Sequence, residues 1–548
     1  MASKDRPEET VRKAMAKTTI APDLVDAIER RVGDEQKAKG ATGKGDPAAD
    51  TKNVLHVIIE FDNRFPGGGA RARDTLLRAY LDWKKGPEAA AKRLPTVSAA
   101  ATKHVQKLRK IFTGSDRLFV EKSSWTDSFA FGELCRATVT RLANWGRENK
   151  VMLIYKIWLD HDISGFVYES GRTIKCDAAR ASFAAAGRGV VWAVADTGIN
   201  GTHPHFRIHQ TLDLPDGVKH YDFTGDYSED EASLVESAKN ALQDGDGHGT
   251  HVAGIIAGET RGLAADAGKR KPRPDNHYRI RIKRERRERD DRTTTFEEDY
   301  AGPIHGLAPY CKLLSLKVME ARNEGKLSNI LAALGYLQRL NDYGRNLRVH
   351  GINLSLGYSF KPEWFAAGQS PLCVEVDRLV RSGVVVVVAA GNAGYGTVTT
   401  MSGGAERASH TGTISDPGNA AQAITVGSTH RDMPHAYGVS YFSAKGPTAD
   451  GRMKPDLVAP GERIVSCAIA DGAAKKNGVA PFREDSGTSM AAPHVSGAIA
   501  AFLSVRTEFK GRPEEVKQIF VGSATDLKRR PEYQGAGLVD LMRALQAV

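Results

Sequence analysis

The sequence predicts an α/β protein, with a doubly wound, mostly parallel sheet preceded by a small α+β domain. Two observations favour this class. Short β-branched runs alternate with helix-length segments through the second part of the 548-residue chain, and such near-continuous apolar strands suit a parallel sheet covered by helices on both faces. An earlier stretch, residues 53–160, mixes expected strands and helices without this regular alternation. The length also allows one large domain beside a smaller one.

The N-terminal third divides into three parts. Residues 1–52 end in a Lys, Gly, Ala and Asp mixture without periodicity and predict a flexible lead-in and linker. Residues 53–160 predict an α+β domain, with strands expected at 54–61, 125–131 and 150–158 and helices at 70–94, 97–111 and 136–148. A connector follows at 161–185, with one expected helix at 177–186.

Residues 186–548 carry the predicted sheet. Its strands are expected at 189–195, 313–318, 351–356, 384–390 and 423–426. An insertion at 259–302 interrupts this domain, and residues 261–292 within it hold 13 Lys or Arg against six Asp or Glu. The net charge of the chain is +11, so most of it lies in this one segment.

The basic insertion allows three interpretations. It is a solvated flexible loop, or a β-hairpin arm that docks on an acidic protein partner or on the N-terminal domain, or a nucleic-acid contact. Alternation of Tyr278, Ile280 and Ile282 with Arg residues favours a hairpin. The aromatic residues that would stack on bases are nearly absent, so we expect no nucleic-acid partner.

Composition restricts the class of protein. Hydrophobic residues are 41% and charged residues 26%, an ordinary globular mixture. No apolar run approaches the roughly 20 residues that cross a bilayer, and the N-terminus lacks the apolar segment of a secretory signal. We therefore expect a cytoplasmic protein without a membrane partner, with export by a non-standard route left open. The five scattered cysteines form no CxxC pair and predict buried thiols in a reducing compartment.

Two segments place an acid and a histidine where a catalytic site would need them. A strand delivers Asp196 at its carboxyl end, followed by Gly198, and active sites collect at that edge of open α/β sheets. The alternative for Asp196 is a turn cap. Gly-rich backbone leads into a helix that begins near His248. His248 is a candidate catalytic base, while a metal pair with His251 or a structural role are the alternatives.

Two further segments supply a nucleophile and an amide donor. Ser489 opens a helix of small and apolar residues, where N–H groups and the helix dipole favour negative charge; the alternative is an N-cap serine. A buried strand runs into a Gly-flanked turn that exposes Asn392, and an amide so placed can donate to a developing oxyanion. It is improbable that all four of these residues have only a structural role. The four together therefore favour nucleophilic catalysis.

These segments resemble the subtilisin-like serine proteases, or subtilases. The motifs DTG, HGTHVAG, AAGN and GTSMAAPHVSG occur here in the Asp, His, Ser order of that family. The resemblance covers about residues 172–548. It implies a subtilisin-like fold and a serine endopeptidase that acts through an acyl-enzyme, with Asp196, His248 and Ser489 as the triad and Asn392 as oxyanion donor. A polypeptide substrate would be held by residues of two segments: Ser355, Leu356, Gly357 and Gly391.

Metal and inhibitor predictions also come from this resemblance. Where the family often has a calcium-ligating Asp, this chain has His205, and the basic insertion replaces the main calcium loop. We expect no required cofactor. Calcium at that place is doubtful, although Asp222, Asp226 and Asp244 leave other sites open. The domain at 53–160 resembles, by arrangement, the family's inhibitory propeptide, which implies a self-inhibited zymogen cut between about Leu159 and Arg172. The alternative is a regulated or silent binding protein with a permanently attached interaction domain.

Overall fold

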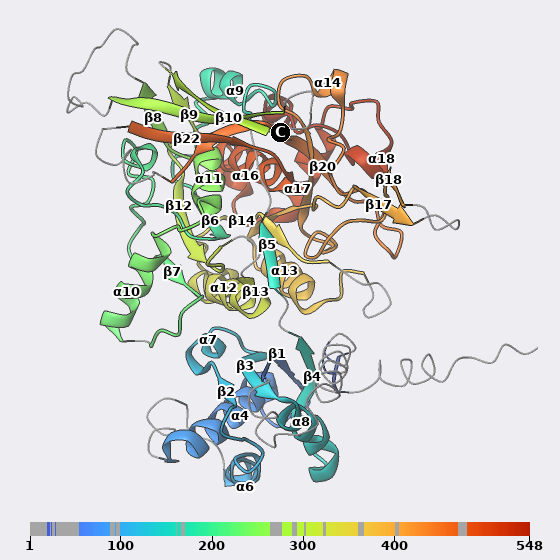
Figure 1. The fold of residues 1–548 in the computed structure, drawn as a ribbon. Coiled ribbons are helices and arrows are strands. Elements are labelled where there is room, and N and C mark those ends of the chain that lie inside the picture. Colours follow the sequence, from blue (N-terminus) through green and yellow to red (C-terminus); the bar gives the residue numbers. More distant parts are fainter. Residues whose placement is uncertain are drawn as a thin grey trace, which may run out of the picture. The chain divides into compact units, whose positions relative to one another are not determined.

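The computed structural model describes a chain of two compact units. The described residues are 19–21, 24, 28, 54–87, 94, 99–159, 162–165, 170–228, 230–262, 277–287, 293–300, 303–321, 325–359, 367–399, 405–469 and 479–548. Unit 1 comprises Met1–His161 with Asp226–Glu229, and unit 2 comprises Asp162–Gly225 with Asp230–Val548. The predicted α/β class with a preceding α+β domain is confirmed (Figure 1).

Unit 1 is an antiparallel sheet with its helices between the strands in the chain. Its elements are β1 (Val54–Phe61), α4 (Gly68–Lys85), α6 (Ala99–Leu108), β2 (Arg117–Leu118), α7 (Val120–Ser124), β3 (Phe129–Cys135), α8 (Arg136–Asn149) and β4 (Ile154–Leu159). The strand order is β2-β3-β1-β4. Both β3 and β4 run antiparallel to β1, which lies between them, so β3, α8 and β4 form a split β-α-β motif.

Two predictions for this unit need correction. The helix expected over 70–94 ends at Lys85, because Gly86 has a φ of 85° and Pro87 follows. The second correction concerns the lead-in, residues 1–52, part of which pairs with the sheet of this unit. Ile20 bridges to Ile157, and Ala21 N–H donates to the carbonyl of Ile157 at 2.8 Å, so this short piece extends the sheet beside β4. Most of the lead-in lies outside the described residues.

The main sheet of unit 2 has seven parallel strands in the order β20-β19-β16-β14-β6-β12-β7. These are β6 (Val191–Asp196), β7 (Tyr221–Asp222), β12 (Lys312–Lys317), β14 (Gly351–Leu354), β16 (Val385–Ala389), β19 (Ile424–His430) and β20 (Leu457–Glu462). After β6 the chain first adds strands on one side and then, from β14 onward, on the other. The order therefore reverses at β6 and β14, and ligand sites in open α/β sheets form at such a switch point.

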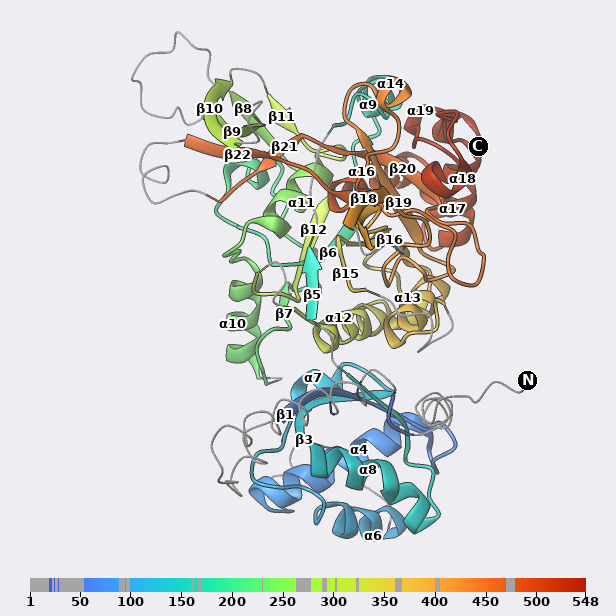
Figure 2. The ribbon, with the colours of Figure 1, turned by 45° about the vertical axis from the view of Figure 1, so that its right-hand side comes forward.

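Helices cover both faces of this sheet (Figures 1 and 2). α11 (His248–Ile256) and α16 (Thr488–Val505) lie on one face, and α12 (Leu327–Leu340) and α13 (Pro371–Arg381) lie on the other. Among the described residues of this unit, the other helices are α9 (Cys176–Phe183), α10 (Glu231–Ala241), α14 (Pro434–Tyr437), α17 (Pro513–Gly522), α18 (Pro531–Gln534) and α19 (Leu541–Gln546), with 3-10 turns at Pro204–Phe206, Asp342–Gly344 and Thr507–Phe509.

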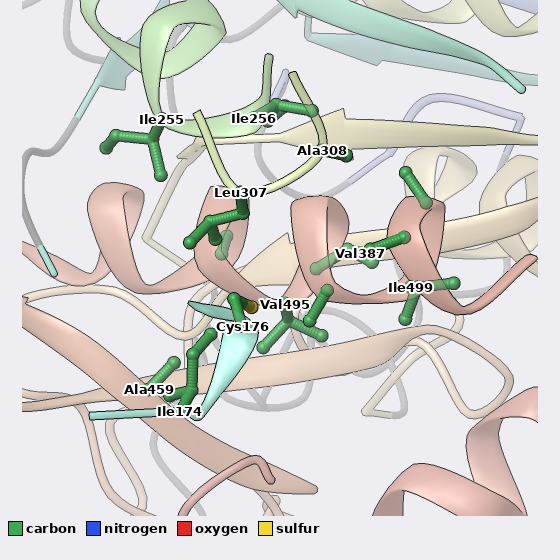
Figure 3. Packing of buried hydrophobic residues seen from close by; sticks show 14 of the residues in the cluster. Ile174, Cys176, Ile255, Ile256, Leu307, Ala308, Val387, Ala459, Val495 and Ile499 are labelled. Atoms are coloured by element: carbon green, nitrogen blue, oxygen red, sulfur yellow. The ribbon is translucent and has the colours of Figure 1, made fainter. Parts of the chain in front are cut away.

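α16 is the central helix of the core. Val495 and Ile499 on this helix are fully buried, and Figure 3 shows them among Val387 of β16, Ile256 of α11 and Leu307. Burying a side chain of this size contributes roughly 1.5–3 kcal/mol. By length and composition alone α16 is apolar enough to cross a bilayer, but 89% of it is buried inside the protein, as expected of a core helix.

The described strands of the basic insertion are part of a second sheet, so they do not form the solvated loop that was one interpretation. Residues 263–276 and 288–292 lie outside the described residues. β9 (His277–Arg287) and β10 (Thr293–Tyr300) form the predicted hairpin. β9 also pairs, in parallel, with β8 (Glu259–Gly262) and β22 (Val479–Asp485), and the sheet is completed by β11 (Ile304–His305) and β21 (Ile464–Cys467). Ile280 and Ile282 are buried in the core of unit 2, because their alternation puts both on the inner face.

The predicted connector is also part of unit 2. β5 (Asp162–Gly165) pairs antiparallel with β13 (Gly325–Lys326) and with β15 (Leu356–Gly357). α9, which follows, contributes Cys176 and Ala179 to the core. The attachment of β5 to unit 2 comes from main-chain pairing, which leaves no pattern in the side chains.

All five cysteines are buried and free, as the sequence predicts. Burial raises the pKa of the Cys373 and Cys467 thiols well above the usual value. These side chains are therefore uncharged packing groups at neutral pH.

We expect the stability of unit 2 to fall in mild acid. Burial lowers the pKa of His203, His350 and His494 from 6.5 to about 4. A histidine kept neutral in the folded chain stabilises it fully above pH 6.5 and loses that contribution as the pH falls toward 4. At pH 5 the unfolding free energy should be lower by about 1–2 kcal/mol per histidine than at neutral pH. Denaturant titrations at pH 7.5 and 5 measure it, and His350→Asn should reduce the difference; equal stability at both pH values would contradict the prediction.

Candidate active site

The four candidate catalytic residues lie at the carboxyl edge of the parallel sheet or at helix starts beside it. β6 ends at Asp196, and β16 is followed by the turn that carries Asn392. His248 is the first residue of α11, and Ser489 is the second residue of α16. Asp196, His248 and Ser489 are fully buried.

Asp196 and His248 are in direct contact. The Nδ1 atom of His248 lies 2.6 Å from Oδ1 of Asp196. Because the carboxylate accepts a hydrogen bond from Nδ1–H, the neutral ring leaves Nε2 as its proton acceptor. The contact depends on Gly249, since a Cβ there would lie 2.1 Å from the carbonyl oxygen of Gly198 and 3.0 Å from Cβ of Asp196.

Asp244 joins the two segments that hold this pair, a role that the sequence analysis missed. Its carboxylate accepts from Thr197 Oγ1 at 2.9 Å and from the N–H of Gly247 at 2.7 Å. It also accepts from the N–H and hydroxyl of Thr250. Burial raises the pKa of Asp244, and these hydrogen bonds oppose the rise. The sequence signal was present, because an Asp before a Gly-rich helix start is a usual capping residue.

Ser489 and Ser355 are joined by a reciprocal pair of hydrogen bonds. The hydroxyl of Ser489 donates to the carbonyl oxygen of Ser355 at 3.0 Å, and the hydroxyl of Ser355 donates to the carbonyl oxygen of Ser489 at 2.6 Å. The second bond is possible because Pro493, four residues on, has no N–H to donate to that carbonyl. A proline inside the helix therefore ties the start of α16 to the end of β14.

Asn392 is oriented by the residue before Ser489. Its Oδ1 accepts from the N–H of Thr488 at 3.0 Å and from the hydroxyl of Thr488 at 3.1 Å. A backbone N–H requires an oxygen, so Nδ2 is the free donor end of the amide. The turn that presents Asn392 needs Gly391, which has a φ of 106° and donates its N–H to Thr488 Oγ1 at 3.1 Å.

The candidate substrate strand is occupied by the chain's own β5. Leu356 pairs with Gly165 and Gly357 pairs with Ser164, antiparallel. On the other side of β5, Gly325 pairs with Ile163. A segment of this chain therefore lies as the middle strand of three, in the extended form expected of a bound peptide.

The segment after Asn392 forms a hairpin of its own. β17 (Tyr395–Thr399) pairs with β18 (Ala405–Ser409). Ser415 follows it, and a Cβ on Gly391 would lie 2.6 Å from the Ser415 hydroxyl.

His205, at the expected calcium position, is used inside the protein. Its ring nitrogens lie 3.0 Å from Thr260 Oγ1 and 3.2 Å from the carbonyl oxygen of Gly254. Burial lowers its pKa well below 6.5, so the ring is neutral and both nitrogens have partners. Asp244 is likewise surrounded by N–H and O–H donors. Among the described residues no group of three or more His, Cys, Asp or Glu is arranged to hold a metal ion, which leaves His248 and His251 without a third ligand there.

Three arginines converge on Glu484, five residues before Ser489. Nη1 of Arg284 on β9 lies 2.5 Å from Oε2 of Glu484. Nε of Arg463 lies 3.0 Å from Oε1 of the same carboxylate, and Nη1 of Arg431 lies 3.3 Å from its Oε2. The glutamate side chain is only 6% exposed. We call these four residues the Glu484 cluster. It connects the basic insertion to β22, the strand that leads into the Ser489 helix.

A parallel α/β domain with Asp, His and Ser in this chain order at one edge of the sheet defines the class of subtilisin-like serine hydrolases. Residues 187–537 match the Subtilase family, and the chain belongs to that family. It is 26% identical over 421 residues to serine protease AprX of Bacillus subtilis, and this match covers 74% of this chain and 77% of that protein. Pyrolysin of Pyrococcus furiosus is 30% identical over 343 residues, 55% of this chain and 21% of pyrolysin. Subtilisin E of Bacillus subtilis is 27% identical over 360 residues, 66% of each.

We expect the Glu484 cluster to stabilise the folded chain. Glu484→Ala removes the shared carboxylate of three partly exposed arginines and should cost about 1–3 kcal/mol of unfolding free energy. Arg284→Ala should cost less, since two cations remain. Arg281→Ala is the matched control, because this arginine of the same strand pairs at 3.4 Å with an exposed glutamate, Glu297, and such pairs contribute about 0–1 kcal/mol. Denaturant titration compares the three variants, and equal losses for Arg281→Ala and Glu484→Ala would refute the prediction.

Proposed function

We propose that the chain is a serine endopeptidase that hydrolyses peptide bonds through Asp196, His248 and Ser489. The observation that carries the proposal is the 2.6 Å contact of His248 with Asp196 at the edge of the sheet where Ser489 and Asn392 also lie. Family membership supports the reaction class, and these residues supply a base, its partner, a nucleophile and an oxyanion donor.

The proposed reaction begins when the Ser489 hydroxyl exchanges the Ser355 carbonyl for His248 Nε2 as its hydrogen-bond acceptor. Oγ then attacks the peptide carbonyl carbon while its proton passes to Nε2, and Asp196 stabilises the resulting imidazolium. The oxyanion accepts a hydrogen bond from Asn392 Nδ2. His248 returns the proton to the leaving amine, an acyl-enzyme forms on Oγ, and water repeats the sequence to release the acid.

The proposed substrate is an extended or unfolded polypeptide. The pairing of β5 with β13 and β15 supports a mode in which a substrate adds as a strand, with Leu356 and Gly357 on one side and Gly325 on the other. Recognition of this kind uses main-chain hydrogen bonds, so it fixes register while asking little of substrate side chains. Gly391 and Ser415 are the proposed neighbours of the substrate side chain nearest the cut. No cofactor forms part of the proposal.

We further propose that unit 1 is a propeptide that inhibits unit 2 through β5. In the chain β5 begins three residues after β4 ends, so unit 1 and the strand on the substrate position are covalently joined. The split β-α-β sheet of unit 1 supports a domain that folds by itself. Cleavage after Gly165 would separate unit 1 and β5 from the rest of the chain and free the strand position.

Two substitutions test the catalytic assignment. Ser489→Ala should lose all labelling by a fluorophosphonate probe, because the adduct forms on that hydroxyl. Asn392→Ala should lower kcat by about 100- to 1000-fold with little change in KM, since an oxyanion donor acts on the transition state. The measurements are peptide hydrolysis and gel-based labelling after any processing. Labelling of Ser489→Ala at the wild-type level would overturn the assignment, and Ser496→Ala is the matched control on the same helix.

Processing is tested by mass spectrometry of the N-termini. The wild-type protein should yield a fragment that begins between Phe166 and Arg172, while Ser489→Ala stays at full length. Mixing active enzyme with Ser489→Ala should show whether a second molecule can make the cut. Full-length wild-type protein that is fully active would instead favour a permanently attached N-terminal domain.

A further inference from the structure

A pocket of about 660 Å³ opens at the amino ends of the central strands, opposite the edge that carries the catalytic candidates. β6 and β12 begin at its wall with Val191 and Lys312, and His350 precedes β14. Because β6 runs six residues from Val191 to Asp196, roughly 16–20 Å of strand separates this pocket from the triad. The two sites are therefore distinct.

The charged groups of the pocket are all cationic. Arg188, Lys312 and Arg348 line it, and no Asp or Glu does. Two histidines, His209 and His350, also line it, and His209 lies 2.7 Å from the carboxylate of Glu259. Within the described part of the chain no carboxylate lies within ion-pair distance of these three cations. Like charges held in one concave site repel one another and focus a positive field into it, so the arrangement favours an anion there.

Contacts with the protein hold two of the cations in place. Lys312 Nζ donates to the carbonyl oxygen of Gln210 at 2.6 Å and of His209 at 3.4 Å. The guanidinium of Arg188 lies 4.6 Å from the ring centre of Tyr310, and the ring of His209 packs edge-on against the same tyrosine at 4.3 Å. Neutral carbonyls and a π-face position these side chains without cancelling their charge.

His350 adds a buried donor. Its Nδ1 accepts from the N–H of Val191 at 3.1 Å, so in the neutral ring the proton is on Nε2. Burial and the nearby Lys510 lower the pKa of His350 to about 4, and the ring stays neutral at pH 7. Lys510 Nζ donates to the carbonyl oxygen of Gly189 at 2.9 Å, which brings a fourth cation to the edge of the pocket.

We propose that this pocket binds a small molecule that carries a phosphate group. Arginine presents paired donors that match phosphate oxygens, and lysine adds a point charge. The volume lies in the range of small-molecule sites, about 300–1000 Å³, and exceeds what one free phosphate fills. A concave site with these groups suits a compact anion better than a nucleic-acid backbone, which needs an extended cationic stripe.

The test uses the full chain with Ser489→Ala, so that self-digestion does not interfere whether or not the proposed function holds. Thermal unfolding and calorimetry are measured with pyrophosphate, with a nucleoside diphosphate, with inorganic phosphate and with citrate, at constant ionic strength. Pyrophosphate or the nucleoside diphosphate should raise Tm in a saturable way. A stronger effect of the nucleoside diphosphate identifies a larger ligand than the phosphate group alone.

One double variant and a control locate the binding. Lys312→Gln with Arg348→Gln should weaken binding at least tenfold, while Arg381→Gln, an exposed arginine at the end of α13, should leave it unchanged. The proposal is overturned if no phosphate compound binds saturably at millimolar concentration, if citrate matches pyrophosphate, or if the double variant binds as tightly as the control. Duplex DNA that binds the double variant and the control equally would also count against this pocket.

Discussion

The buried hydrogen bond between Asp196 and His248 is the constraint on which the site depends. It joins the end of a strand to the start of a helix that is 52 residues away in the chain, and both side chains are fully buried. A buried carboxylate and imidazole are stable only with their partners in place. The close approach at Gly249 and the several hydrogen bonds of Asp244 hold the backbone so that the two meet. The chemistry proposed for His248 therefore rests on packing as much as on the residues themselves.

The start of α16 shows the same dependence. Helix starts leave N–H groups without partners inside the helix, and here Asn392 accepts one of them from Thr488. That bond satisfies the backbone and at the same time leaves Nδ2 as the donor end of the Asn392 amide. Pro493 frees the carbonyl of Ser489 for Ser355. Groups that complete the secondary structure thus also orient the groups assigned to catalysis, which explains why the helix start and the site occur together.

Local patterns predicted much of this structure. Asp196, His248, Asn392 and Ser489 each lie at the end of a strand or the start of a helix that the sequence predicts, so their placement at one edge of the sheet follows from its topology. Partners distant in the chain were not predictable. The pairing of β9 with β22 depends on register between segments about 200 residues apart, and β5 is held by main-chain bonds that leave no side-chain pattern. The hydrogen bonds of His205 to Thr260 and Gly254 likewise join segments that are distant in the chain.

The basic insertion contributes to the core of the protein as well as to its charge. Ile280 and Ile282, on alternate positions of β9, are buried in the core of unit 2. Arg284, on the same strand, is used by Glu484. A basic side chain that is paired inside the protein attracts no external anion, whereas Lys312, bound only to neutral carbonyls, keeps its charge available. The arrangement of partners, and not the number of positive residues in a segment, therefore decides which part of this chain can bind an anion.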